Sequence, residues 1–333
     1  MFRSISSKSA ILVLAAATML TLLGAESLHR AFAVPQSIFP GWSSEEFETR
    51  VESIDPARDC VFVGDSRVGW GVADKLVTAA LYKYPNAPAR ALNLGMAASG
   101  IDDILGYIRR RVRGKGAVMM INYSPAAFFW FSSTLEPPIK PTANAALEIS
   151  DRHTLVDRYF NMAITTDLHK IPADVSTFIS AMQGEHRPPK KYWESRTVFP
   201  EGFVNAHFVS EDGKPVDFAE YQLETYRDTF HAKQKPAALQ NLANAFRKDG
   251  WNVVMFRLPI GPRMQALEDT LPLDLKPASV AAAAGVPLID FQTDPRTRKF
   301  QTQDQSHLTP ASARAIAPFL AEACEKAWTH SIR

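Results

Sequence analysis

The stretch CVFVGDSR, residues 60–67, decides the fold. Its short apolar run ends abruptly at Gly64, a pattern typical of a buried parallel strand. Ser66 would then lie just beyond the carboxyl end of that strand, at the edge where open α/β sheets bind their ligands. The alternative is an ordinary turn, because glycine, aspartate and serine are all common turn residues. The far end of the chain decides between these two interpretations.

There, the stretch DQSHLTP, residues 304–310, precedes a long helical pattern. Thr309 is a good N-cap and Pro310 a good first helical residue, so we expect the helix to begin directly after this loop. Asp304 and His307 therefore lie in the loop that enters the helix, where the carboxylate can orient the imidazole. Residues 228–231, DTFH, repeat this spacing inside a stretch that looks helical, so they are the weaker candidate.

Three side chains from these two stretches fit the roles of a serine triad. A serine hydroxyl needs a general base to become a nucleophile, and the base needs a group that orients it. Ser66 supplies the hydroxyl, His307 the base and Asp304 the orienting carboxylate. The sequence therefore predicts a catalytic triad built from the end of the first strand and the start of the last helix.

Both blocks resemble a known family. The GDS at 64–66 and the D-x-x-H at 304–307 are similar to the signatures of the SGNH (GDSL-type) hydrolase and acyltransferase superfamily. The NLG at 93–95 resembles the second block of that family, and Asn122 stands in the place of the third. The resemblance implies an oxyanion hole made by the backbone N–H groups of Ser66 and Gly95 and the side chain of Asn122.

The third block departs from the usual pattern of that superfamily. Its Gly-x-Asn-Asp is absent, and residues 121–124 read INYS instead. This form is closer to the membrane-anchored envelope branch, which resembles alginate O-acetylation proteins and D-alanyl transfer proteins. The resemblance covers 59–122 and 251–330, and it implies serine-dependent ester chemistry without a cofactor.

Strand-like and helical patterns alternate along most of the chain from residue 60 onward. Such alternation indicates a parallel sheet covered by helices on both faces. The sequence therefore predicts a flavodoxin-like three-layer α/β/α sandwich with a large mid-chain insertion. The expected strands are 61–63, 91–94, 117–121, 253–256 and 286–289, and the expected helices are 72–82, 101–113, 236–248 and 280–284.

Four segments divide the chain. Residues 1–35 carry positive charges ahead of an uncharged apolar stretch, which predicts a signal peptide or an uncleaved signal anchor. Residues 36–58 are expected to form a juxtamembrane spacer with a short helix, and residues 59–330 the SGNH-like domain. We expect this domain to lie on the periplasmic or extracytoplasmic side of the cell inner membrane as a single-pass protein, or to be secreted or periplasmic if the segment is cleaved.

Residues 124–235 break the alternation and are rich in aromatic side chains. Because this insertion leaves the carboxyl end of the third strand, we expect it to lie over the crevice as a lid or as a docking surface for a partner. Aromatic faces suit stacking on sugar rings, and exposed apolar faces suit a membrane-protein partner. The alternative is that these aromatics pack a small core of the insertion itself.

Composition excludes several other classes of function. A net charge of +2 over 333 residues gives no electrostatic footprint for nucleic acid. Cys60 and Cys324 are the two cysteines of the chain, and no metal-ligand spacing accompanies them. They could form a disulfide in an exported protein or remain two buried thiols.

The functional expectation combines these observations. We expect serine-dependent acyl transfer or ester hydrolysis, most simply of O-acetyl groups, on a cell-envelope polysaccharide or other acylated glycan. A membrane-bound O-acyltransferase is a possible partner. The alternative is a non-catalytic envelope protein that binds a glycan or acts as a scaffold for such an acyltransferase. The two hypotheses differ on whether Ser66 and His307 come within hydrogen-bonding distance.

Overall fold

The computed structural model describes residues 42, 44–97, 100–129, 195–207, 217–219 and 235–331, all of which belong to one compact unit. The predicted signal segment at 1–35 lies outside the described residues. So do most of the insertion and the DTFH stretch at 228–231. Within the described part of the chain, no helix is both long and apolar enough to cross a membrane.

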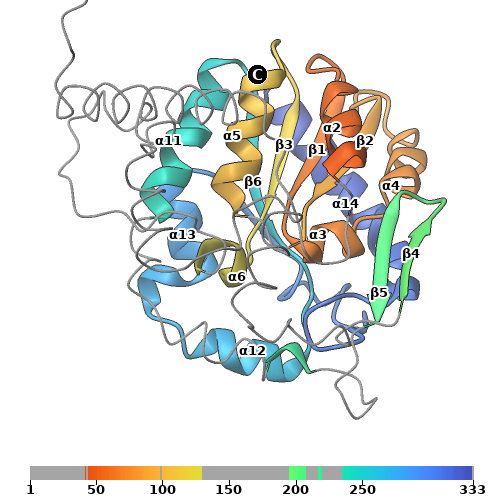
Figure 1. Cartoon of the computed structure of the whole chain (residues 1–333). Coiled ribbons are helices and arrows are strands. Elements are labelled where there is room, and N and C mark those ends of the chain that lie inside the picture. Colours follow the sequence, from red (N-terminus) through yellow and green to blue (C-terminus); the bar gives the residue numbers. More distant parts are fainter. Residues whose placement is uncertain are drawn as a thin grey trace, which may run out of the picture. The chain divides into compact units, whose positions relative to one another are not determined.

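A five-stranded parallel sheet forms the centre of the unit (Figure 1). The strand order is β2-β1-β3-β6-β7, which is the flavodoxin-like order when the strands of this sheet are counted along the chain. All five predicted strands are confirmed, and so is the three-layer class. Their bounds are β1 Asp59–Gly64, β2 Arg90–Gly95, β3 Val118–Asn122, β6 Asn252–Arg257 and β7 Leu288–Asp290.

Helices cover both faces of this sheet (Figure 1). One face is packed by α4 (Asp74–Leu81) and α14 (Pro310–Ser331), which also contact each other. The opposite face is packed by α2 (Ser44–Glu52), α5 (Ile101–Arg111), α11 (Lys235–Lys248) and α13 (Pro277–Ala284). The remaining described helices are short: α3 Ser66–Gly71, α6 Pro125–Phe129, α12 Pro262–Asp269 and the 3-10 turn η3 Leu273–Leu275.

Strand β1 is buried on both faces, which explains its unbroken apolar run. Cys60 and Phe62 belong to the core cluster that includes buried residues of α14. Because side chains alternate along a strand, Val61 and Val63 point to the opposite layer. A disulfide joins Cys60 to Cys324 of α14, which decides between the two alternatives that the sequence left open. The bond ties the strand before the proposed nucleophile to the helix after the proposed base.

Helix α2, from the predicted spacer, packs onto the domain. Phe47 and Val51 lie four residues apart and are fully buried, because residues at this spacing share one face of a helix. Arg50 of the same helix forms an ion pair with Asp74 at 2.7 Å. The segment therefore contributes to the core of the domain as well as connecting to the residues before it.

The described part of the insertion contains a hairpin that the sequence reading did not predict. Strands β4 (Ser195–Phe199) and β5 (Phe203–His207) pair in antiparallel fashion, and β5 packs against α3. Gly202 has a φ of +86°, which suits glycine at the turn between the strands. The Glu201 side chain accepts a hydrogen bond from Arg314 of α14 at 2.8 Å, so the turn is fixed to the last helix.

Candidate active site

A tight turn between β1 and α3 places Ser66 at the first position of the helix. Asp65 is the N-cap, and its Oδ1 accepts a hydrogen bond from the backbone N–H of Arg67 at 3.0 Å. Its other carboxylate oxygen accepts from the Ser124 hydroxyl. A Cβ at Gly64 would lie 2.5 Å from Val68 Cγ2, so the turn requires a residue without a side chain. The turn therefore holds Ser66 at the carboxyl edge of the sheet.

The loop before α14 brings the other two predicted residues to Ser66. His307 Nε2 lies 2.7 Å from Ser66 Oγ, and His307 Nδ1 lies 2.7 Å from Asp304 Oδ2. Asp304 Oδ1 also accepts from the backbone N–H groups of Ser306, at 3.0 Å, and His307, at 2.8 Å. Gln305 adopts a positive φ of 72°, which keeps the loop tight. The carboxylate is thus fixed by its own loop, and both imidazole nitrogens are engaged.

Two aromatic rings that the sequence reading missed enclose the imidazole of His307. The Trp70 ring lies 4.0 Å from it between centroids and is tilted by 35°, whereas Phe218 meets it edge-on at 4.9 Å. The backbone N–H of Phe218 also donates to the Asp304 carbonyl at 3.1 Å. Because Phe218 belongs to the insertion, part of that segment lies directly against His307. Trp70 could have been noticed, since it follows Ser66 by one helical turn.

Gly95, another predicted oxyanion donor, has a backbone N–H that already has a partner. It donates to Asn93 Oδ1 at 2.9 Å, which leaves it engaged in this structure. The Asn93 amide in turn donates to the carbonyls of Val68, Gly69 and Val72 at 3.1, 3.2 and 2.8 Å. A Cβ at Gly95 would lie 2.0 Å from the Gly69 nitrogen. The NLG block at residues 93–95 therefore holds α3 in close contact with β2.

Asn122, the other predicted donor, has a different environment. It is the last residue of β3 and fully buried, and neither polar atom of its side chain has a hydrogen-bond partner among the described residues. A Cβ at Gly64 would lie 2.9 Å from Asn122 Cβ, so its side chain begins beside the turn that presents Ser66. Buried amides are nearly always hydrogen-bonded, so an unpaired one beside a candidate nucleophile has donors to offer.

The Ser66 N–H is the third predicted donor. As the first helical residue, Ser66 has no intrahelical acceptor for this group, and the described residues provide no other.

The Tyr123 hydroxyl is unsuited to proton transfer, because burial raises the pKa of Tyr123 far above its usual value. It donates instead to the Leu275 carbonyl at 2.6 Å.

Comparisons with known proteins find similarity at the level of solved structures. No protein-family model matches the chain, and no curated protein matches it either. LAE5, an alpha/beta hydrolase enzyme from the metagenome of Lake Arreo, Spain, is 14% identical; the match covers 81% of this chain and 97% of LAE5, with a TM-score of 0.36.

Two mutants of Axe2 from Geobacillus stearothermophilus also match. One is described as an acetylxylan esterase and the other as an acetyl-xylooligosaccharide esterase, and each is 12% identical to this chain. The matches cover 81% of this chain and 95% and 96% of those chains, with TM-scores of 0.35 and 0.34. At such scores the likeness carries no argument about the reaction, so the functional argument depends on the geometry of this chain.

Proposed function

We propose that this chain is an exported serine-dependent enzyme that hydrolyses or transfers acyl groups, most simply O-acetyl, on a cell-envelope polysaccharide or related glycan. The observation that carries the proposal is the continuous hydrogen-bonded series from Ser66 Oγ through His307 to Asp304, with both contacts to the imidazole at 2.7 Å. This arrangement favours the enzyme over the non-catalytic scaffold, because a scaffold needs no such alignment.

In the proposed mechanism, His307 Nε2 accepts the proton of Ser66 as the serine oxygen attacks the acyl carbonyl. Asp304 holds the imidazole in the required tautomer and stabilises its protonated form. The Ser66 N–H and the Asn122 amide donate to the oxyanion as it develops. The alcohol leaves with the proton from His307, and water or a sugar hydroxyl then attacks the acyl-enzyme to give free acid or a new ester.

The proposed compartment depends on the first 35 residues and on the disulfide. An apolar stretch after two basic residues suits export, and a disulfide persists in oxidising compartments outside the cytoplasm. An exported esterase meets acylated glycans of the envelope, which is why we propose them as substrates. A fusion of alkaline phosphatase after residue 58 tests the location, since it is active on the extracytoplasmic side and inactive in the cytoplasm.

Labelling of the purified full-length protein with a fluorophosphonate, read by intact mass, tests the chemistry. We expect one adduct on the wild type and none on Ser66→Ala or His307→Ala. Ser53→Ala is the matched control, because Ser53 is exposed and its hydroxyl donates to the Arg50 carbonyl. An unlabelled wild type with a cooperative unfolding transition would overturn the enzyme proposal and favour the scaffold.

A second assay separates hydrolysis from transfer. Protein that reacts with the fluorophosphonate is incubated, before any labelling, in two mixtures. One contains an acetylated polysaccharide alone, and the other also contains an unacetylated oligosaccharide. Free acetate and acetylated oligosaccharide are quantified in both. Acetate release in both mixtures identifies an esterase. Acetylated oligosaccharide that exceeds free acetate identifies a transferase, which must exclude water from the acyl-enzyme.

A further inference from the structure

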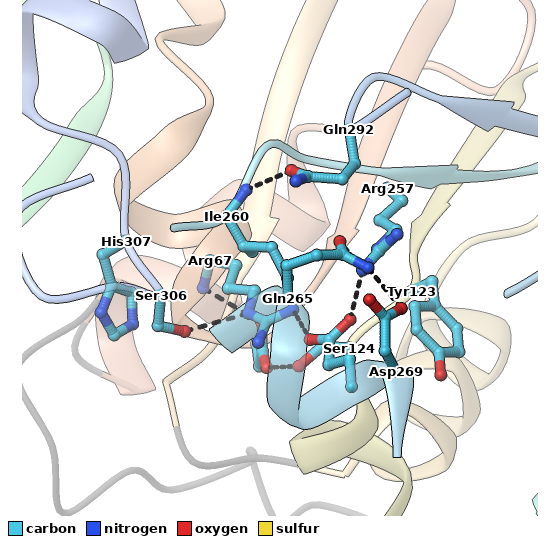
Figure 2. Close-up of polar contacts among 12 residues, drawn as sticks. Arg67, Tyr123, Ser124, Arg257, Ile260, Gln265, Asp269, Gln292, Ser306 and His307 are labelled. Carbon is cyan, nitrogen blue, oxygen red and sulfur yellow. Dashed lines mark hydrogen bonds and ion pairs between the residues drawn. The ribbon is translucent and has the colours of Figure 1, made fainter. Parts of the chain in front are cut away.

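We propose that Arg67 is a positioning residue that holds the nucleophile and the general base in register. The inference rests on the proposed function, because it concerns the alignment of Ser66 with His307. Arg67 Nε donates to Ser306 Oγ at 3.0 Å, and Figure 2 shows this bond close to His307. Arg67 directly follows Ser66, and Ser306 directly precedes His307. The two chain segments are therefore joined by two neighbouring cross-links, Ser66 to His307 and Arg67 to Ser306.

The guanidinium of Arg67 is anchored on its other side by a buried ion pair. Arg67 Nη1 lies 2.8 Å from Glu268 Oε1 of α12, and both side chains are almost fully buried. Glu268 also pairs with Arg257 at 2.7 Å, and Arg257 lies 3.7 Å from Asp290. Two arginines and two carboxylates balance in charge, which buried ionic groups require. The cross-link is thus attached to β6, β7 and α12 rather than to one flexible loop.

The geometry of an arginine suits this role. Its rigid planar fork presents Nε to Ser306 and Nη1 to Glu268 at the same time, whereas a lysine has a single ammonium group on a flexible stem. Moreover, Arg67 is 2% exposed in its side chain, so it is placed to align other groups rather than to meet solvent. We therefore expect its loss to slow the serine chemistry beyond any effect on folding.

Ser306→Ala tests the inference in the full-length protein. It removes the bond to Arg67 and leaves the buried ion pairs intact. Ser312→Ala is the matched control: Ser312 accepts from the Gln301 N–H at 2.7 Å beside the same loop but does not contact Arg67. We expect Ser306→Ala to lower the maximal rate of fluorophosphonate labelling about 10- to 100-fold with unchanged probe affinity, the rate equivalent of a hydrogen bond to a charged group. Ser312→Ala should lower the thermal midpoint and keep the labelling rate.

Arg67→Lys completes the test as a double-mutant cycle. Lysine keeps the charge beside Glu268, so we expect the variant to fold and to label as slowly as Ser306→Ala. The double variant should be no slower than either single one, because both remove the same contact. A Ser306→Ala rate within twofold of wild type, or fully additive losses, would overturn the inference and leave the triad untouched. A folded wild type that does not label would overturn the proposed function and this inference with it.

Discussion

Replacing Asn122 by leucine is expected to stabilise the protein and to slow its chemistry. The Asn122 amide is fully buried, and neither its nitrogen nor its oxygen has a partner within the described residues. Leucine has a similar branched shape but no polar atoms. The substitution therefore removes an unfavourable feature of the resting protein together with a proposed donor to the oxyanion.

The two effects have different sizes. An unsatisfied buried donor or acceptor costs about 1–3 kcal/mol, so two of them destabilise the folded state by about 2–6 kcal/mol. An imperfect fit of leucine beside Gly64 offsets about 1–3 kcal/mol of the gain. The central values of these two ranges give a net increase of about 2 kcal/mol in the free energy of unfolding. Loss of one oxyanion donor slows acyl transfer about 100- to 1000-fold.

Urea unfolding and the rate of fluorophosphonate labelling measure these two quantities on the same sample. Asn122→Asp is a useful comparison, because it keeps the shape of the side chain while removing the N–H donor and adding a charge that must be buried. It should lose both stability and rate. An Asn122→Leu variant that labels at the wild-type rate would refute the assignment of the amide to the oxyanion. A variant that unfolds at lower urea than the wild type would refute the stability argument from the unpaired amide.

Three further predictions concern the scaffold of the site. Cys60→Ala with Cys324→Ala removes the disulfide that closes a loop of 264 residues, so the free energy of unfolding should fall, by about 5.6 kcal/mol at most in the chain-entropy model; an unchanged urea midpoint would contradict it. Gly95→Ala forces a Cβ into the backbone of α3 and should lower both stability, by about 1–3 kcal/mol, and labelling rate. Gly106→Ala, whose Cβ meets only the end of an arginine side chain, should do neither. Burial raises the pKa of Asp74 in the folded protein above its ordinary value of 3.8. The unfolded chain therefore releases this proton more readily, and the folded state loses stability as the pH rises from below 3.8 through the raised pKa. Asp74→Asn cannot ionise, so its free energy of unfolding should increase relative to that of the wild type over this pH range. Urea midpoints that change with pH by the same amount in both proteins would argue against it.

Much of the sheet and the triad could be predicted because their signals are local. A strand buried on both faces is an unbroken apolar run in the sequence. Thr309 and Pro310 are typical of the first positions of a helix, so they predict where the last helix begins. Ser66, Asp304 and His307 could then be placed by their positions at strand and helix ends. Their meeting follows from the parallel topology, which brings these ends to one edge of the sheet.

The NLG block at residues 93–95 makes a local contact that the family resemblance did not predict. The resemblance pointed to Gly95 as an oxyanion donor, and in this structure Asn93 two residues earlier accepts that N–H in an Asx turn. The Asn-x-Gly spacing could have indicated this turn. The contacts of Phe218 with His307 and the pairing of β4 with β5 could not be derived in the same way. They depend on where a long insertion returns to the domain, which no local pattern encodes.

The sequence separation of 241 positions between Ser66 and His307 has a consequence for how the protein is made. A chain synthesised from its N-terminus presents Ser66 long before His307, so every growing intermediate holds the serine without this imidazole. Cys60 is likewise synthesised long before Cys324, and the disulfide can form only after the last helix has been synthesised. The contact between Ser66 and His307 and the covalent closure of the disulfide therefore both form at the end of folding.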